Sequence, residues 1–209
     1  MIAPDKFISI IEDNGMIVEI GDWVLKEACK SLKSLHQAGY EELSVAVNIA
    51  PQQFQSDNFV NDIKSILTKV GLEAKYLELE ITERATITNM NYTIEVLKKL
   101  KELGVKISID DFGTGYSSLN YLKEFAIDTL KIDKSFVCGL NATGENNAIA
   151  ETIITMAHNL ELNVTAEGVE NSQQIKFLEQ KQCDKLQGNL FSPAVPEEEV
   201  ETVLEKFNA

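Results

Sequence analysis

Apolar residues along the chain follow two alternating rhythms, one typical of buried strands and one typical of amphipathic helices. Short apolar runs, which predict strands, lie at residues 44–49, 77–81, 105–109, 129–132, 164–166 and 185–190. Between them, apolar residues recur at the 3.6-residue spacing of a helix, at residues 23–35, 59–70, 93–103, 118–125, 148–160 and 173–179. This alternation predicts an α/β fold with a parallel sheet covered by helices.

Six strand–helix units in one uninterrupted series favour a barrel over an open sheet. A (β/α)₈ barrel usually takes about 250 residues and eight strands, whereas the chain has 209 residues. We therefore expect a TIM-type (β/α)₈ barrel that lacks about the first two strands. No linker rich in Pro, Gly or Ser divides the sequence, so we expect residues 1–209 to form a single domain.

Each of the six predicted strands shows a polar residue at or near its carboxyl end, where the chemistry of βα barrels takes place. The set is Asn48, Glu80, Asp110 with Asp111, Lys131, Glu167 and Gln187. Converging carboxylates oppose one another's ionisation, and divalent cations relieve this repulsion. Carboxylate and amide oxygens are the ligands that Mg²⁺ and Mn²⁺ prefer. Two adjacent acids can serve two metal ions, the usual arrangement for phosphoester cleavage, and a lysine there would position water or stabilise negative charge.

Structural alternatives remain for individual residues. A single acid at a strand end often only caps the following helix, although agreement among the strand ends disfavours that interpretation for the whole set. Glu83, in the stretch EITE, fits a metal site or a solvated loop, and the sequence slightly favours the loop. Asp133 fits either a supporting partner of the site or an ion pair with Lys134. His36 and His158 lie in helical segments, and we interpret them as surface or core-edge residues.

The charge, cysteine content and hydropathy of the chain narrow the classes of function that it can have. The formal net charge of −14 argues against non-specific binding to nucleic-acid backbones, yet it permits a small anionic ligand held through metal ions. Cys29, Cys138 and Cys183 are far apart and form no C-x-x-C pair, which indicates a reducing compartment. No apolar run reaches the ~20 residues of a membrane span, and the first residues do not resemble a signal peptide. We therefore expect a cytoplasmic protein.

Five stretches resemble the EAL-domain family in order and spacing: VNIAPQQF, LELEITE, DDFGTGYSSLNYLKEFAIDTLKIDKSFV, TAEGVEN and CDKLQGNLFS. The resemblance covers essentially the whole chain. It implies a TIM-type barrel and a bacterial phosphodiesterase that hydrolyses cyclic di-GMP to linear pGpG with two metal ions, Mg²⁺ or Mn²⁺. It also implies a homodimer through the region after the fifth strand, and upstream GGDEF or sensory domains as further partners.

The resemblance assigns roles residue by residue. The implied metal ligands are Asn48, Glu80, Asp110 and Glu167, with Asp111 serving the second metal. Lys131 resembles the lysine that orients the attacking water, and Glu167 is also the favoured general base. The remaining implied roles belong to Gln187 near a guanine base, Glu83 as anchor of loop 112–118, and Asp133 and Glu170 as further acids of the metal and water network.

One departure from the family pattern concerns the stretch that gives the family its name. Its Glu-Ala-Leu carries a metal-ligating Glu, with a phosphate-binding Arg nearby, and no Glu-Ala-Leu occurs in these 209 residues. The matching region begins at IAPDKFISIIEDNGMI, residues 2–17, which in the family follows that strand. We therefore expect weak or no activity from this N-terminally truncated chain alone. The alternative is a catalytically inactive EAL domain that acts as a cyclic di-GMP receptor or a protein-interaction module.

Overall fold

The computed structural model describes residues 6–114, 122–140 and 145–207, and it divides into two units, Met1–Ile107 and Ser108–Ala209. In the first unit, β1 (Val45–Ile49) and β2 (Leu77–Thr82) pair in parallel, from Val45 opposite Leu77 to Ile49 opposite Ile81. The helices of this unit are α1 (Ile8–Asp13), α2 (Ile17–Gln37), α3 (Pro51–Phe54), α4 (Phe59–Val70), the 3-10 helix η2 (Ala74–Tyr76), α5 (Glu83–Ile87) and α6 (Met90–Leu103).

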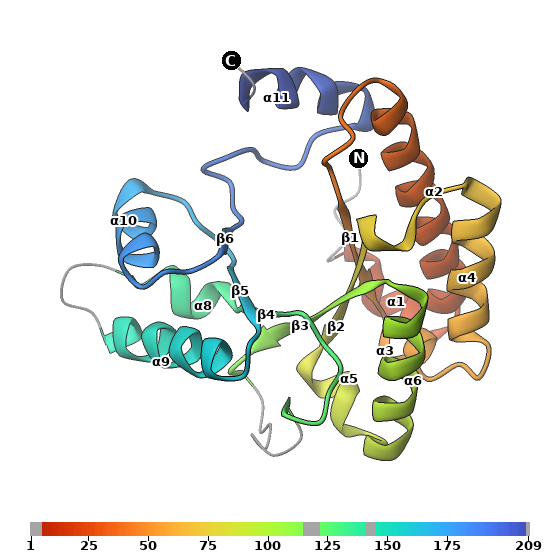
Figure 1. Cartoon of the computed structure of the whole chain (residues 1–209), viewed down its shortest axis with the longest axis horizontal. Coiled ribbons are helices and arrows are strands. Elements are labelled where there is room, and N and C mark those ends of the chain that lie inside the picture. Colours follow the sequence, from red (N-terminus) through yellow and green to blue (C-terminus); the bar gives the residue numbers. More distant parts are fainter. Residues whose placement is uncertain (1–5, 115–121, 141–144, 208–209) are drawn as a thin grey trace. The chain divides into compact units, whose positions relative to one another are not determined.

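Nearly the whole of β2 is buried, and its apolar residues are buried most deeply. Leu77, Leu79 and Ile81 on β2 are at most 1% exposed, which is expected where every second side chain of a strand faces covering helices. Helix α2 packs against β1 and α4, and α4 packs against α6 (Figure 1). The apolar stripe of α4, with Phe59, Ile63 and Leu67 buried, is the reason these helices associate.

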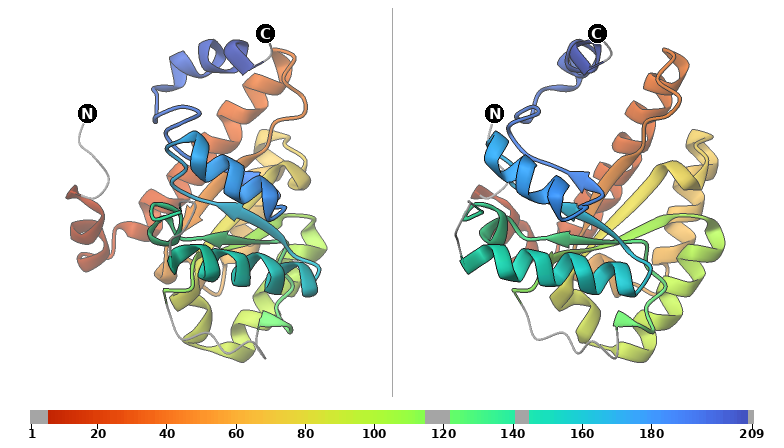
Figure 2. Two further views of the ribbon diagram at one scale, coloured as in Figure 1. Left: turned by 90° about the vertical axis from the view of Figure 1, so that its left-hand side faces the viewer. Right: turned by 60° about the vertical axis from the view of Figure 1, so that its left-hand side comes forward.

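The second unit contains four parallel strands in chain order. They are β3 (Lys106–Phe112), which begins at the boundary, β4 (Thr129–Ile132), β5 (Asn163–Ala166) and β6 (Lys185–Leu186). The helices are α8 (Lys134–Val137), α9 (Glu145–Asn159), α10 (Ser172–Gln180), the 3-10 helix η3 (Glu197–Glu199) and α11 (Val200–Phe207). Helices α8, α9 and α10 lie on the same side of β4 and β5 (Figures 1 and 2).

The strands of the second unit have one apolar and one polar face. Ile109, Leu130, Ile132, Val164 and Ala166 are at most 1% exposed and alternate with polar neighbours. The polar positions are Ser108, Asp110, Thr129, Lys131 and Thr165, all buried. Because successive side chains of a strand point to opposite faces, the apolar set packs under the helices and the polar set gathers on the opposite face. The candidate site lies on this polar face.

The predicted elements and the observed ones differ mainly at their ends. Residues 59–70 and 129–132 coincide with α4 and β4, whereas α2 begins at Ile17 rather than at residue 23. Strand β3 continues to Phe112 rather than ending at residue 109. Strand β6 stops at Leu186 rather than at residue 190, because the backbone beyond it bonds to the loop after β5: the Gln187 carbonyl accepts from the Val169 N–H, and the Leu190 N–H donates to the Val169 carbonyl.

Some expectations concern segments that the structure leaves undescribed or elements that periodicity does not reveal. The first half of the predicted helix at 118–125, residues 118–121, lies outside the described residues. The short helices α1, α3, α5 and α8 were not predicted, because four to six residues are too few to display a helical period. The assignment of residues 1–209 to one domain stays a prediction.

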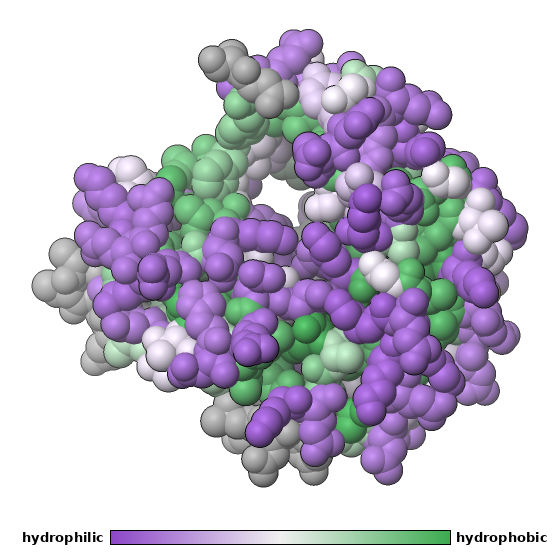
Figure 3. All heavy atoms as spheres, viewed as in Figure 1, coloured by the Kyte–Doolittle hydropathy of each residue, from purple (hydrophilic) through white to green (hydrophobic). Residues whose placement is uncertain are grey.

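Hydrophilic residues cover most of the surface seen in Figure 3, with apolar residues showing between them. Among the described helices, none combines the length and the apolar character that crossing a bilayer requires.

Candidate metal centre

A bulge in β3 brings two neighbouring carboxylates to the same side of the strand. Ile109 pairs with Leu130 and Phe112 with Ile132, so Asp110 and Asp111 together oppose the single residue Lys131. In a regular strand the two aspartates would point to opposite faces. Asp111 adopts a left-handed conformation, with φ of 54°, which aspartate tolerates better than most residues. Its N–H donates to Asp110 Oδ1 at 2.9 Å, and this bond fixes the two side chains relative to each other.

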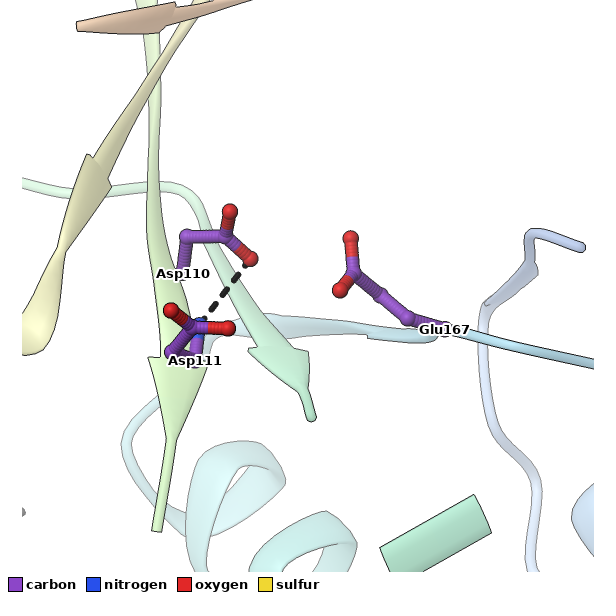
Figure 4. A group of neighbouring side chains, drawn as sticks. All are labelled: Asp110, Asp111 and Glu167. Carbon is purple, nitrogen blue, oxygen red and sulfur yellow. Dashed lines mark hydrogen bonds between the residues drawn. The ribbon is translucent and has the colours of Figure 1, made fainter. Parts of the chain in front are cut away.

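Glu167 completes a cluster of three carboxylates. It follows β5 directly, and its N–H donates to the Ile132 carbonyl at 3.2 Å, which extends the ladder of β4 and β5 by one bond. One ligand oxygen from each of Asp110, Asp111 and Glu167 lies within 4.8 Å of the others. Figure 4 shows the two aspartates side by side on β3 and Glu167 reaching toward them from the end of β5.

Lys131 supplies a positive charge from the strand between them. The residue is 2% exposed, and its Nζ lies 2.5 Å from Glu167 Oε1 and 3.3 Å from Asp110 Oδ1. A buried ammonium is retained only where paired charges compensate for its lost hydration. One lysine facing three carboxylates leaves an excess of negative charge in the cluster, and this excess favours a bound cation.

Burial and neighbouring charges perturb the acids of this cluster. Burial raises the pKa of the Glu167 carboxyl; the Lys131 ammonium opposes this effect, and the charges of Asp110 and Asp111 add to it. The pKa of Asp111 is also raised, by the lost hydration of its carboxyl, by the charge of Asp110 and by Asp133. Asp111 is exposed as a residue, so the adjacent acids add to a loss of hydration that is only partial.

Asp133 lies next to the cluster and begins helix α8. Its Oδ1 accepts a hydrogen bond from the Ser135 N–H at 2.9 Å, as an N-cap residue does. Burial alone would raise the pKa of Asp133, but the hydrogen bonds from Ser135, together with Asp111 and the charge of Lys134, outweigh burial and hold the pKa below its ordinary value. Asp133 also forms a side-chain hydrogen bond with Asp111. Its role as a supporting partner of the site stays a prediction.

The donor set fits a hard divalent cation. All three groups that converge are carboxylates, and oxygen ligands are preferred by Mg²⁺ and Mn²⁺. Neither histidine nor cysteine contributes to this group of described residues, so it differs from the usual nitrogen and sulfur sites of zinc. Asp110, Asp111 and Glu167 are therefore the residues of this unit that can hold a metal.

Two further predicted ligands are neighbours on the paired strands β1 and β2 of the first unit. Asn48 on β1 and Glu80 on β2 are register partners, so their Cα atoms lie opposite each other in the parallel pair. Glu80 is 6% exposed, and Asn48 is exposed. A glutamate this deeply buried on a strand is uncommon unless it is paired or binds a metal. The position of Glu80 is therefore consistent with a functional role.

Glu83 corrects one expectation from the sequence. The favoured interpretation was a solvated loop acid, but Glu83 is 2% exposed at the start of α5 and is therefore not solvated. The apolar residues around EITE gave no sign of this burial, because the turn from β2 into α5 is too short to show a pattern. Its predicted role as anchor of loop 112–118 concerns residues of which 115–118 lie outside the described part of the chain.

Gln187 and Glu170 are exposed residues whose backbones are fixed. The Gln187 N–H donates to the Ala166 carbonyl at 2.9 Å, and its carbonyl accepts from the Val169 N–H at 3.0 Å. The Glu170 N–H donates to Gln174 Oε1 at 2.7 Å. The carboxylate group formed by Asp110, Asp111 and Glu167 does not include Glu170.

His36 and His158 lie on α2 and α9, as predicted.

Sequence reasoning missed Gln174, which is 1% exposed and bonds to the loop that carries Glu167. A signal was present: Asn171 followed three residues later by Gln174 is the pattern of a capping box at a helix start. The structure contains that box, with the Asn171 side chain accepting from the Gln174 N–H and the Gln174 side chain accepting from the Asn171 N–H.

These features define a class of protein, α/β with parallel strands and an acidic, oxygen-only cluster at the carboxyl ends of the strands. Residues 1–194 match the family model of the EAL domain, so the chain belongs to the EAL-domain family. The family resemblance of the five sequence stretches is thereby confirmed.

Known proteins of this family are closely similar to the chain. It is 46% identical over 207 residues to cyclic di-GMP phosphodiesterase NbdA of Pseudomonas aeruginosa, which covers 99% of the chain and 26% of NbdA. It is 48% identical over 198 residues to signaling protein YkoW of Bacillus subtilis, which covers 95% of the chain and 25% of YkoW. The chain thus spans about a quarter of the length of these curated relatives.

A solved structure shares the fold. The structure described as PaMucR phosphodiesterase in complex with c-di-GMP matches with a TM-score of 0.92 and 38% identity, covering 95% of this chain and 81% of that chain. This likeness to an EAL-domain structure confirms the predicted fold class, an α/β fold of the TIM-barrel type with parallel strands.

Proposed function

We propose that this chain is the catalytic part of a cyclic di-GMP phosphodiesterase that hydrolyses its substrate to linear pGpG with two divalent cations. The observation that carries the proposal is the cluster of Asp110, Asp111 and Glu167 around Lys131, in a chain 46% identical to the phosphodiesterase NbdA. The geometry supports phosphodiester hydrolysis because it combines several oxygen ligands with one buried cationic side chain.

Metal-ligand roles are assigned in each unit by itself. We assign Asp110 and Glu167 from the second unit, and Asn48 and Glu80 from the first, as metal ligands, with Asp111 serving the second metal. Different observations support the two groups. The converging carboxylate oxygens support the assignment of the three acids of the second unit. The pairing of Asn48 with Glu80 on neighbouring strands supports the assignment of these two residues of the first unit. Mg²⁺ and Mn²⁺ both suit such a set.

The chain's own residues would carry out the proton and charge handling. When bound, the cations supply Lewis-acid stabilisation of the phosphate and make a water molecule more acidic. Lys131, held between Asp110 and Glu167, orients that water and stabilises negative charge on the phosphate oxygens. Glu167 accepts the proton of the water. Its raised pKa makes it a stronger base than an ordinary carboxylate once it is ionised.

The other assigned residues would shape the site around the reacting atoms. Gln187, exposed on a fixed backbone, offers a side-chain amide that can both donate to and accept from the edge of a guanine base. Asp133 supports Asp111 through their hydrogen bond. Buried Glu83 anchors the loop that follows β3, and Glu170 belongs to the outer water network.

A second candidate function is a cyclic di-GMP receptor or a protein-interaction module without catalysis. The observation that favours it is the absence of a Glu-Ala-Leu stretch, and with it of the implied extra ligand and phosphate-binding Arg, from these 209 residues. In that case the carboxylates would hold a cation and the ligand without cleaving the phosphodiester.

The test compares binding with turnover. Cyclic di-GMP is incubated with the chain and with a longer chain that includes an upstream Glu-Ala-Leu strand, each with Mg²⁺ or Mn²⁺, and pGpG is measured by chromatography. We expect turnover in the longer chain, and loss of most of it in its Glu167→Gln variant but not in its Glu179→Gln variant, since Glu179 is an exposed glutamate on α10. Binding of cyclic di-GMP by calorimetry without any turnover would favour the receptor.

The proposed function also carries a proposal for the oligomeric state, the partner domains and the cellular location of the protein. We infer a homodimer through the region after the fifth strand, upstream GGDEF or sensory domains as partners, and a cytoplasmic location where cyclic di-GMP is the ligand. Sedimentation velocity over a range of protein concentrations tests the dimer: a mass that stays at 23.3 kDa at every concentration would contradict it.

A further inference from the structure

Gln174 on α10 connects two loops that carry residues of the candidate site. Its side chain is 1% exposed, and each of its polar atoms has a defined partner. Oε1 accepts from the Glu170 N–H at 2.7 Å and from the Asn171 N–H at 3.0 Å. Nε2 donates to the Val137 carbonyl at 3.0 Å. A side chain this buried and this fully bonded does more than cap its own helix.

The first loop that Gln174 holds is the one that begins with Glu167. Four of the five N–H groups from 167 to 171 donate hydrogen bonds to identified acceptors, and two of these bonds end on Gln174. The other two are the Glu167 N–H to the Ile132 carbonyl and the Val169 N–H to the Gln187 carbonyl. The loop is therefore attached to β4 at its start, to residue 187 in its middle and to Gln174 at its end.

The second segment that Gln174 holds is α8, which follows β4 and its Lys131. Val137 is the last residue of α8, and its carbonyl accepts from the Leu140 N–H at 3.1 Å as well as from Gln174 Nε2. Asp133 caps the other end of this four-residue helix. Gly168 packs on the same helix, because a Cβ at Gly168 would lie 2.7 Å from the Cβ of Lys134. Gly168 thus contacts the first residue of α8, and Gln174, which holds the end of the Glu167 loop, bonds to its last residue.

We propose that Gln174 is a positioning residue for Glu167: by holding the 167–171 loop against α8, it sets the place of the Glu167 carboxylate relative to Lys131 and Asp110. This inference rests on the proposed function, because the position of the Glu167 carboxylate matters for catalysis only if Glu167 binds a metal or accepts a proton. The Lys131 to Glu167 separation of 2.5 Å leaves little room for movement, so loosening the loop should disturb this ion pair first.

Two variants separate the two kinds of bond that Gln174 makes. Gln174→Met removes both the acceptor and the donor while keeping a side chain of similar length. Gln174→Glu keeps an acceptor for the Glu170 and Asn171 N–H groups but loses the donor to Val137, so it should rescue the loop in part. Gln173→Met is the matched control, because Gln173 is the exposed neighbour on the same helix.

The first measurement is native-state amide hydrogen exchange, which needs neither metal nor substrate. In Gln174→Met we expect the Glu170 and Asn171 amides to exchange faster, and the Glu167 amide as well, each by about five- to tenfold, the factor that one hydrogen bond contributes. Rates are compared at equal global stability, determined by urea unfolding. If only the Glu170 and Asn171 amides exchange faster while Glu167 is unchanged, Gln174 merely caps α10 and the inference is wrong.

The second measurement is Mn²⁺ affinity by calorimetry on the same proteins. We expect Gln174→Met to bind Mn²⁺ about tenfold more weakly, as is typical when a group that orients a metal ligand is removed, with Gln174→Glu between it and the unchanged Gln173→Met. An unaltered affinity in Gln174→Met would overturn the positioning role. If the unmodified chain binds no Mn²⁺, the proposed metal site fails, while hydrogen exchange still decides the role of Gln174.

Discussion

At the scale of single residues, the site depends on charges that oppose one another until a cation binds. Asp110, Asp111 and Glu167 converge within 4.8 Å, and among the described residues Lys131 forms ion pairs with two of them, Asp110 and Glu167. Burial raises the pKa values of Asp111 and Glu167 most, and the charges of the neighbouring acids raise them further. Protein sites that bind metals commonly hold such unfavourable arrangements, which the ion relieves.

Asp111→Asn should separate metal binding from stability. A group with a raised pKa stabilises the fold when protonated, below its ordinary pKa, and this stability is lost as pH rises through the raised value. At pH 7 the ionised Asp111 therefore destabilises the metal-free chain. Asparagine keeps the shape and tolerates a φ of 54°, so we expect the metal-free Tm to rise by about 1–2 °C, since a partly exposed charge contributes well below 1 kcal/mol.

The same variant should lose the response to metal. Millimolar Mn²⁺ raises the Tm of the unmodified chain, because a ligand that binds only the folded state stabilises it, and this rise should be much smaller in Asp111→Asn. Scanning calorimetry with Mn²⁺ and with EDTA measures both effects. A metal-free Tm that falls in the variant would show that the Asp111 carboxylate stabilises the fold even when no cation is bound.

Lys131→Met should be far more damaging than loss of an exposed lysine. The ammonium is buried between Asp110 and Glu167, and removing one partner of a buried ion pair typically costs about 3–5 kcal/mol. Lys99→Met is the control, because its 2.6 Å pair with Glu95 is exposed and screened by water. Urea unfolding of both variants at pH 7 checks this, and a small loss in Lys131→Met would indicate that the two carboxylates take up protons instead.

At the scale of elements, irregular backbone delivers the side chains to the site. The bulge in β3 turns Asp110 and Asp111 to one side, and the loop after β5 turns sharply at Gly168 before the chain enters α10. Regular strands and helices provide the frame, but neither alternation nor helical spacing predicts where the frame bends. The local conformations at these bends are therefore the part of the site most sensitive to substitution.

Gly168→Ala tests the bend after Glu167. Gly168 has a φ of 70°, and an added Cβ would lie 2.7 Å from the Lys134 Cβ. Gly71, with a φ of 72° at the end of α4 and open space around it, is a matched control for the conformation alone. We expect Gly71→Ala to cost about 1–2 kcal/mol for the left-handed conformation, and Gly168→Ala to cost about 1–3 kcal/mol more for overpacking.

Urea unfolding compares the two alanine variants, and Mn²⁺ calorimetry follows the site. Only Gly168→Ala should weaken Mn²⁺ binding, because the clash displaces the loop that carries Glu167 whereas Gly71 lies in the other unit. Equal losses of stability in the two variants would mean that the packing of Gly168 on α8 adds nothing beyond its conformation.

At the scale of the whole molecule, the sequence predicted the order of strands and helices well because each strand is short, apolar and flanked by long amphipathic helices. Residues 59–70 and 129–132 were predicted with their observed bounds. The sequence also placed Asp110, Asp111, Lys131 and Glu167 together, since the carboxyl ends of parallel strands meet at one edge of a sheet.

What the sequence could not predict depends on contacts between distant segments. The burial of Glu83 is invisible in EITE, because it arises from packing rather than from a local pattern. The early end of β6 depends on bonds from residues 187 and 190 to Val169. Gln174 reaches Val137, 37 residues away in the sequence. Local patterns specify elements, whereas such contacts specify the positions of side chains at the site.

The last prediction concerns activity, which belongs to the molecule as a whole. The resemblance to the family implies a metal-ligating Glu and a phosphate-binding Arg in a Glu-Ala-Leu stretch, and the 209 residues contain no such stretch. Loss of a catalytic metal ligand removes part of the transition-state stabilisation, so we expect this chain alone to cleave cyclic di-GMP at least about a hundredfold more slowly than a chain extended by that strand. Single-turnover assays at saturating Mn²⁺ compare the two, with Glu167→Gln in the longer chain as the inactive reference. Equal rates would show that the acids and Lys131 of this chain suffice, and the Glu-Ala-Leu strand would then have no essential part in the chemistry.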